Sequence, residues 1–398
     1  MKDHLLNYWA RVRGGEMGSL PAVLGLVVLC TVFGIVRPVF FSPGNIANLF
    51  TQGAQVTIIA MGLVFVLLIG EIDLSAGFAS GVCAAVLGVT LTNHGWPWYA
   101  ACLAAIVTGT VIGLILGLLV AKMGIPSFVV TLAAFLAFQG VGLALLKEGT
   151  NISIRDEVIV GIGNRNMTPL LSWVLAVVVI VGFTAIELIR WMRRNRRGVT
   201  TDPISVVVAR IVTVGAMITF LAWVLTLERA ANPLFATVKG VPVIVPVIGV
   251  MLIVWTFVLR RTAYGRHIYA VGGNAEAARR AGINVDRIKI SAFVICSGMA
   301  AVGGIVAAGH DSSVDSNTGG SNVLLYAVGA AVIGGTSLFG GRGRMIDAVL
   351  GGMVIAVIIN GMALLNQNAS TKYIITGTVL LLAAGVDALS RRRAVVTR

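Results

Sequence analysis

Carboxylates and hydroxyls gather in one short segment of a chain that is otherwise strongly apolar. Glu71, Asp73 and Ser75 lie in the sequence GEIDLSAG, between two apolar runs. Ionised carboxylates at membrane depth are costly, so they are normally paired or turned toward a polar cavity. We therefore expect these side chains to line a polar pathway or gate. The alternative is that the acids cap the helix that follows, at its positive N-terminal end, and the two roles are compatible.

A second segment, GGTSLFGG at residues 334–341, repeats the pattern of the first. Five positions match at one fixed offset, namely Val64, Ile69, Gly70, Leu74 and Gly77 with Val328, Ile333, Gly334, Leu338 and Gly341. Duplicated halves are common in transporters, where the pathway lies between the repeats. The repeat predicts that Thr336 and Ser337 line the same pathway. Asn360 is the remaining candidate for the pathway. Within its apolar helix it indicates either a polar break that faces the pathway or a side chain that makes a buried hydrogen bond.

Another cluster, Tyr269–Lys289, is basic and rich in small residues. Within it Ala275–Ala281 is a helix-forming stretch, opened by Gly273 and Asn274 as a cap and closed by Gly282. A short helix held between two spans can act as a rigid lever against another protein. The alternative is a solvated basic loop, which seldom spends small residues on a compact helix.

Several chemistries have no motif in the sequence. There is no G-x-x-x-x-G-K-[ST] nucleotide-binding loop, and the four histidines, 4, 94, 267 and 310, have no metal-ligand spacing. No Ser, His and Asp constellation can be assembled, so we expect no catalytic residue, metal or cofactor. The composition and these absences favour a channel or transporter whose energy source lies elsewhere, and they disfavour an enzyme.

The elements that must position these residues are membrane-spanning helices. Hydrophobic residues make up 57% of the chain and charged residues 12%, with a mean hydropathy of +0.94, whereas soluble domains are about 25% charged. We predict an all-α polytopic membrane protein with about 10–12 transmembrane helices in two weakly repeated halves. The expected spans are 20–36, 51–70, 76–91, 98–120, 128–146, 169–189, 211–227, 243–259, 290–308, 323–338, 346–365 and 373–389. The G-x-x-x-G steps in Gly109–Gly117 predict close helix packing.

The net charge of +14 reflects orientation in the membrane. Apolar runs interrupt the chain too often for a nucleic-acid binder, and basic clusters mark cytoplasmic loops. We expect a multi-pass protein of the plasma or inner membrane, surrounded by the lipid bilayer, with both termini on the cytoplasmic side. The expected regions are a cytoplasmic segment 1–18, a transmembrane domain 19–389 with a basic insertion at 190–205 and a cytoplasmic loop at 260–289, and a basic tail 390–398.

Four segments of the chain, in their order, resemble the permeases of ribose, galactose, arabinose and xylose ABC importers. They are GEIDLSAG, GIPSFVVTLA, GGNAEAARRAGINVDR and VIGGTSLFGG. The basic insertion RWMRRNRRGVTT and the span after it look like the D-xylose branch. The resemblance implies a non-enzymatic subunit that forms a homodimer, receives sugar from an extracytoplasmic binding protein and is driven by a cytoplasmic ABC ATPase. The residues implied to couple to that ATPase are Gly273, Asn274, Glu276, Ala277, Ala278, Arg279, Gly282 and Ile283.

The sequence departs from the family pattern beside the expected pathway. Leu324, Leu325 and Tyr326 stand where relatives often carry Glu-Leu-Asp, and Arg344 and Asp347 stand where they carry small residues. The expected cargo is a pentose, D-xylose first, with ribose, arabinose or galactose as alternatives. A secondary transporter using Asp73 or Glu71 as an ion site is the alternative of a different class.

Overall fold

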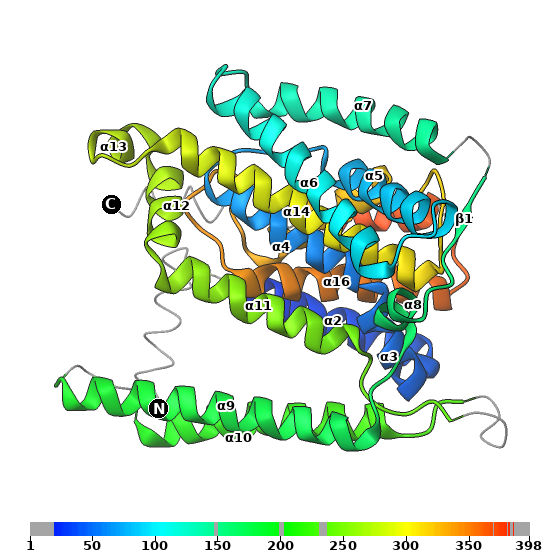
Figure 1. The fold of residues 1–398 in the computed structure, drawn as a ribbon. Helices are drawn as coiled ribbons and strands as arrows, with labels where there is room; N and C mark the ends of the chain where they lie inside the picture. Colours follow the sequence, from blue (N-terminus) through cyan, green and yellow to red (C-terminus); the bar gives the residue numbers. More distant parts are fainter. Residues whose placement is uncertain are drawn as a thin grey trace.

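The chain folds into a bundle of long apolar helices (Figure 1). The computed structural model describes residues 20–146, 150–198, 203–230, 237–368, 370–379, 381–382 and 385. Within this part of the chain nine helical segments are long and apolar enough to cross a membrane, and two shorter apolar helices accompany them. The predicted all-α polytopic membrane fold is confirmed. The expected terminal segments 1–18 and 390–398 lie outside the described residues.

The elements follow one another in the order α2 (Leu20–Val36), η1 (Pro38–Phe41), α3 (Pro43–Gln52), α4 (Ala54–Leu68), α5 (Ala76–Gly88), η2 (Val89–Asn93), α6 (Trp98–Ala121), α7 (Ser127–Leu146), β1 (Ile152–Ser153), α8 (Glu157–Asn164), α9 (Pro169–Arg196), α10 (Ile204–Thr226), α11 (Ile244–Arg261), α12 (Ala263–Gly273), α13 (Ala275–Arg280), α14 (Val285–Asp311), β2 (Ser313–Val314), α15 (Ser321–Gly334) and α16 (Met345–Leu364). The short strands β1 and β2 pair in antiparallel fashion.

Most predicted spans coincide with a helix, and the differences have local causes. The span expected at 51–70 is two helices, because the chain turns at Gly53 between α3 and α4. The basic insertion expected at 190–205 continues α9 up to Arg196 and contains the start of α10 at Ile204, with residues 199–202 outside the described part. Of the last span, expected at 373–389, only residues 373–379, 381–382 and 385 are described, and they are helical.

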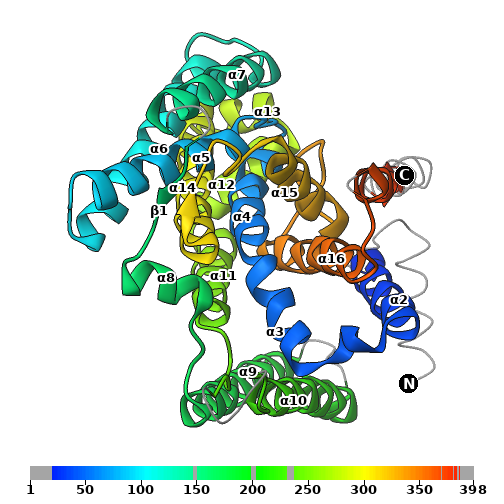
Figure 2. The ribbon, with the colours of Figure 1, turned by 90° about the vertical axis from the view of Figure 1, so that its right-hand side faces the viewer.

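Helices α4 and α14 form the centre of the bundle (Figures 1 and 2). α14 packs against α4, α5 and α6, while α4 also contacts α15 and α16. Nearly every residue of α4 is buried, which explains why its sequence is apolar on all sides. The ring of Phe65 in α4 meets Trp255 of α11 edge to face at 5.1 Å.

The glycines of α6 let it lie directly against α14. A side chain at Gly109 would come within 2.5 Å of the Ser297 carbonyl oxygen, and one at Gly113 within 2.4 Å of the Phe293 carbonyl oxygen. No real Cβ tolerates such contacts, so the helix pair depends on these residues lacking one. The predicted role of the G-x-x-x-G steps in helix packing is confirmed, and their partner is within the same chain.

The bundle has two distinguishable ends. α14 begins beside α13 and ends beside β2, so its 27 residues, about 40 Å of helix, separate an α13 end from a strand end. At the α13 end Lys122, which follows α6, forms an ion pair of 3.1 Å with Asp286 of α14. At the strand end β1 and β2 bring residues 152–153 beside residues 313–314.

The α9–α10 hairpin stands apart from the rest (Figures 1 and 2). Its two helices pack on each other, and α10 also contacts α3. A small apolar cluster of Ala47, Leu225 and Val241 makes this attachment at the strand end. Glu187 joins the two helices by accepting ion pairs from Arg190 at 3.3 Å and Arg210 at 2.9 Å.

Candidate functional site

The segment that follows α4 leaves the helix and runs as irregular backbone to α5. Gly70 has a φ of +77°, a left-handed value that only glycine adopts freely, and it ends the α4 turn. The peptide groups of Ile72 are held by the start of α7: its N–H donates to the Ser127 hydroxyl at 3.3 Å, and its carbonyl accepts from the Thr131 hydroxyl at 3.3 Å. Non-helical backbone in a membrane protein needs such partners, and here α7 supplies them.

Asp73 and Ser75 form a buried turn at the start of α5. Both are fully buried, and one carboxylate oxygen of Asp73 accepts hydrogen bonds from the Ser75 N–H at 2.8 Å and the Ser75 hydroxyl at 2.7 Å. The other oxygen, Oδ2, has no hydrogen-bond partner among the described residues. The carboxylate therefore stabilises the turn that precedes α5, whose N-cap residue Ser75 makes no side-chain cap hydrogen bond, and capping of α5 by the acids stays a prediction.

Glu71 is paired with a cation that the sequence did not single out. Lys289 Nζ of α14 lies 2.5 Å from Glu71 Oε1, and the two side chains are 24% and 17% exposed. Lys289 lies in the second turn of α14, close behind α13. The pair therefore ties the first repeat segment to the helix that leads out of the expected coupling region.

The second repeat segment is the loop between α15 and α16. Thr336 and Ser337 are buried, and the Ser337 hydroxyl accepts a hydrogen bond from the Phe339 N–H at 3.2 Å. The Thr336 hydroxyl has no partner among the described residues. Ser337 thus organises its own loop, while Thr336 is a buried polar group without a local bond.

The two repeat segments meet at the α13 end. The Gly341 N–H donates to the Leu68 carbonyl at 2.8 Å, at the last residue of α4. A Cβ on Gly340 would lie 2.9 Å from the Gly70 nitrogen, so the two backbones are in direct contact. The residues that the repeat predicts to act together are therefore brought together at one end of the bundle.

The expected coupling region is more helical than the sequence analysis predicted. The predicted helix is α13, which the Asn274 side chain caps by accepting from the Ala277 N–H at 2.9 Å. Gly282, with a φ of +84°, ends it. The additional helix α12 was missed, although Thr262 marks its start by accepting from the Gly265 N–H at 3.2 Å.

Most of the predicted coupling residues form an exposed face at this end. The exposed members are Gly273, Asn274, Glu276, Ala277, Arg279 and Gly282. Glu276 holds Arg280 at 3.2 Å and Arg279 at 3.8 Å in ion pairs on the surface of α13. Ala278 is instead buried and Ile283 half-buried, so these two pack α13 onto the bundle.

Helix α12 touches both repeat segments. A Cβ on Gly272 would lie 1.7 Å from the Leu68 carbonyl oxygen and 2.8 Å from the Gly341 nitrogen, so Gly272 packs into the junction of the two segments. The Tyr269 hydroxyl donates to the Gly343 carbonyl at 2.8 Å. These contacts link α12 to both repeat segments, and the Lys289 ion pair links α14 to the first, while α13 lies between α12 and α14 and packs on them. Sequence reasoning missed these contacts because the residues that Tyr269 and Gly272 touch are distant in the sequence. The only local signal is the aromatic residue and the glycine themselves, within YAVGG.

Asn360 lies away from this junction. α16 runs without a break through Asn360, which is buried and donates to the Gln52 side-chain oxygen at 3.1 Å. The predicted polar break is wrong, and the alternative, a buried hydrogen bond, is confirmed. Asn360 lies 15 residues beyond the start of α16, about 22 Å along the helix, so it is not part of the cluster around Glu71.

The departures from the family pattern also have structural roles. Leu324 is buried against α5, where a Cβ on Gly77 would lie 2.8 Å from its Cβ. Asp347 accepts from the Arg344 N–H at 2.8 Å and forms an ion pair with the Arg344 side chain at 2.9 Å, so the two cap α16. Leu325 is exposed.

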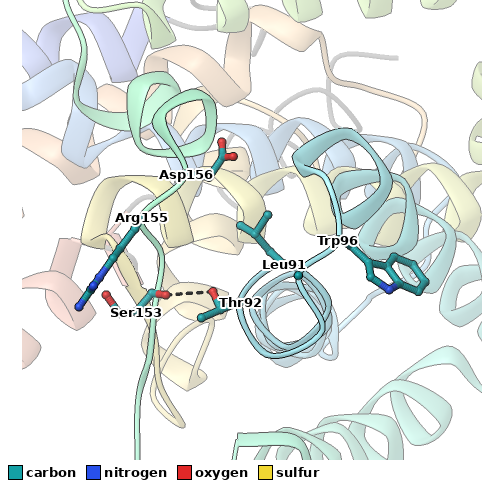
Figure 3. A pocket seen from close by; sticks show the side chains of 7 residues that line it. Leu91, Thr92, Trp96, Ser153, Arg155 and Asp156 are labelled. Carbon is teal, nitrogen blue, oxygen red and sulfur yellow. Dashed lines mark hydrogen bonds between the residues drawn. The ribbon is translucent and has the colours of Figure 1, made fainter.

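A hollow of about 430 Å³ at the strand end is the other candidate for a polar site (Figure 3). The Thr92 hydroxyl donates to the Ser153 carbonyl at 3.0 Å, and the Asp156 carboxylate caps α8 by accepting from the Val158 N–H at 2.9 Å. In Figure 3 the Trp96 ring and the Arg155 side chain point away from each other. The polar groups do not converge on one point, as a small-ligand site requires.

The helices and the junction of two repeated segments define a polytopic membrane transport protein. Residues 45–384 match the family described as branched-chain amino acid transport system / permease component, and the chain belongs to this family. It is 34% identical over 354 residues to the xylose transport system permease protein of Escherichia coli strain K12, covering 89% of this chain and 87% of the relative.

Two further relatives agree with this assignment. The xylose transport system permease protein of Haemophilus influenzae is 31% identical, covering 93% of this chain and 96% of its own, and the ribose import permease protein of E. coli strain K12 is 29% identical, covering 92% of each. No solved structure matches. The resemblance to sugar-importer permeases is confirmed, and the protein is a transport component and not an enzyme.

Proposed function

We propose that this chain is the membrane-spanning permease of an ABC importer for a pentose, D-xylose in the first instance. An extracytoplasmic binding protein delivers the sugar, and a separate ATPase docks on α13 and drives its passage. The names of the relatives support a sugar cargo, because two of them carry xylose and one carries ribose in their names. Two copies of the chain form the permease.

The observation that carries this proposal is the contact between the coupling region and both repeats. Movement of α13 reaches the two segments through its neighbours in the chain: through α14 by the Lys289–Glu71 ion pair, and through α12 by the Tyr269 hydrogen bond to Gly343 and the packing of Gly272 at the junction. A run of helices connected at three points transmits displacement better than a solvated loop does. Separation of the two repeat segments would then open the α13 end of the pathway.

The charge distribution supports a cytoplasmic α13 end. Arg190–Arg197 end α9, Arg260 and Arg261 end α11, and Arg279 and Arg280 end α13, all on the same side of the bundle. Lys and Arg near the ends of spans mark the cytoplasmic side. With α13 inside, Glu71, Asp73, Thr336 and Ser337 border the inner part of the pathway, and Ser75 lies next to them at the start of α5.

Reconstitution tests the drive and the cargo together. The chain, its ATPase and its binding protein are placed in vesicles, and uptake of labelled D-xylose is compared with uptake of ribose, arabinose, galactose and a branched-chain amino acid. We expect ATP-dependent uptake with D-xylose preferred. The exposed substitution Glu276→Arg should abolish uptake without loss of the protein from the membrane, whereas Lys372→Glu, which lies outside this region, should not. Full uptake by Glu276→Arg would contradict docking at α13.

One observation keeps a second candidate in view. Asp73 Oδ2 is buried and has no partner among the described residues, which is the setting in which a carboxylate can carry a proton. An ion-gradient-driven carrier would lose uptake on addition of an uncoupler and keep it without ATPase activity. We expect the reverse, with uptake that resists the uncoupler and requires a competent ATPase.

A further inference from the structure

A basic hollow lies between α9 and α11 at the α13 end. It measures about 400 Å³, within the range of roughly 300–1,000 Å³ that is common for ligand sites. Its lining consists of five arginines and two isoleucines, namely Arg190, Arg193, Arg194, Arg197, Arg261, Ile186 and Ile189. Four of the arginines come from the end of α9, and Arg261 faces them from the end of α11.

The positive charge of this hollow is largely unneutralised. Among the described residues Arg190 is the one arginine of the five with a carboxylate partner, Glu187, which Arg210 shares. Like charges brought together at a span end repel each other unless an anion lies between them. The hollow is therefore complementary to an anionic group.

The wall next to the arginines is apolar and belongs to the membrane. Ile186 and Ile189 line the hollow about two to three turns before Arg197, and the same helix continues away from it as an exposed apolar surface that includes Val177, Val178 and Val181. A free phosphate ion would gain no binding energy from contact with such an apolar wall. An acidic protein surface would have to enter the membrane interface to reach it.

The α9–α10 hairpin is fastened to the bundle at the opposite end. The apolar cluster at Ala47, Leu225 and Val241 and the hydrogen bond from the Met167 N–H to the Val241 carbonyl lie at the strand end. Figure 1 shows the hairpin standing away from α11 toward the α13 end. Within a bilayer, the space beside the apolar helices α9 and α11 would be occupied by lipid acyl chains.

The geometry points to a binding site for an anionic phospholipid between α9 and α11. The lipid phosphate lies among the arginines, and its acyl chains follow the apolar face of α9 into the bilayer. Basic pockets between spans bind anionic headgroups in this way. The lipid therefore connects the hairpin to the bundle at the α13 end. At that end the described residues form no apolar cluster between hairpin and bundle like the one at Ala47, Leu225 and Val241.

Native mass spectrometry of the purified full chain tests the site. The protein in detergent is titrated with phosphatidylglycerol, cardiolipin or phosphatidylcholine. We expect the two anionic lipids to be retained and phosphatidylcholine to be lost. The double substitution R197Q/R261Q, which removes one cation from each wall, should weaken retention at least about tenfold. The matched control R196Q/R266Q removes two exposed cations near the same helix ends and should change it less than about twofold.

Several results would overturn the proposal. They are equal retention of phosphatidylcholine, an equal loss in the control pair, or displacement of the lipid by inorganic phosphate or soluble glycerol phosphate, which would identify a plain anion site. If R197Q/R261Q retained lipid fully but lost the ATPase, the hollow would be a protein contact instead. Thermal unfolding of each variant shows that it is folded, and R193Q/R194Q provides a second pair from the same hollow.

Discussion

At the scale of single residues, an ion pair joins positions that are 218 residues apart. Glu71 lies in the irregular segment after α4 and Lys289 in the second turn of α14, and both side chains are largely shielded from solvent. The sequence marked Glu71 as a costly charge but gave no means of choosing its partner, because pairing across that distance depends on the whole packing of α4 on α14. The same holds for the contact of Gly341 with Leu68.

Breaking this ion pair should uncouple the permease. Glu71→Gln or Lys289→Gln leaves one partly buried charge without its partner, at a cost of roughly 1–3 kcal/mol in unfolding free energy. We expect either variant to lower ATP-dependent uptake strongly, measured in reconstituted vesicles, while thermal unfolding remains cooperative. The exchange variant Glu71→Lys/Lys289→Glu should recover part of the uptake. Failure of the exchange together with normal uptake by both single variants would contradict a role for the pair.

Gly272 and its neighbour offer a matched comparison. A methyl group at Gly272 would meet the Leu68 carbonyl oxygen at 1.7 Å, whereas a methyl group at Gly273 would meet nothing within 4 Å. We expect Gly272→Ala to displace α12 from the junction and to lose uptake and several degrees of thermal stability. Gly273→Ala should keep its melting temperature. Equal melting temperatures for the two variants would show that α12 does not pack at the junction as described.

Glu228, which follows α10 at the strand end, carries a pH dependence. N–H groups of Val238 and Ala230 donate to its carboxylate and lower its pKa from 4.5 to about 2. Because the pKa in the folded state lies below that of the unfolded chain, the ionised carboxylate contributes stability in full above about pH 4.5 and loses it as the pH falls toward 2. Glu228→Gln should flatten the fall in melting temperature over that window.

The control for Glu228 is Glu157→Gln. The Glu157 side chain is exposed, and its ion pair with Arg165 is long, at 3.8 Å. We expect this variant to keep the acid-dependent loss of stability that the parent protein shows. An unchanged pH profile in Glu228→Gln would mean that the backbone donors do not hold its carboxylate.

At the scale of elements, apolar runs predicted most helices because a span must be continuous and apolar. The observed ends of the helices differ from the predicted ones where the ends of the apolar runs do not set them. The arginine-rich end of α9 stays helical to Arg196, and Gly53 divides α3 from α4 within one apolar run. α12 was missed because the run around Tyr269 is mixed in character and short. The α13 prediction succeeded because Asn274 and Gly282 are caps that act within a few residues.

A six-residue helix such as α13 depends on its cap. Asn274→Ala removes the acceptor of the Ala277 N–H and should cost about 1 kcal/mol, which is large for a helix with a single turn and a half. We expect weaker binding of the ATPase, measured with the purified partner, at an unchanged melting temperature. Asn284→Ala removes the analogous cap of the long, buried α14 and should leave ATPase binding intact.

At the scale of the whole molecule, the chain is a compact bundle with one accessory hairpin. α4, α5, α14 and α16 pack around the repeat junction, while α9 and α10 lie outside it (Figure 2). The chain leaves the bundle and returns to it at nearly one point, since the Met167 N–H donates to the Val241 carbonyl at 2.8 Å and the Val243 N–H donates to the Arg165 carbonyl at 3.0 Å. The hairpin can therefore be separated from the bundle by a single short connection.

Excision of the hairpin tests this division of the molecule. A short Gly-Ser linker that replaces residues 168–240 removes two spans, so every later helix keeps its side of the membrane. The lost contacts include those of Leu225 with Ala47 and Val241 and the hydrogen bond from the Val241 N–H to the Ser172 hydroxyl at 2.9 Å, whereas the Glu71–Lys289 pair and the contact of Leu68 with Gly341 remain.

We expect the shortened chain to fold, to support reduced ATP-dependent uptake and to lose retention of anionic lipid. Leu225→Ala, which weakens the same attachment by roughly 2 kcal/mol, should lie between the parent and the shortened chain in melting temperature. A shortened chain that cannot fold while Leu225→Ala is unaffected would place the hairpin within the folding core, because the bundle would then need it for more than this one attachment.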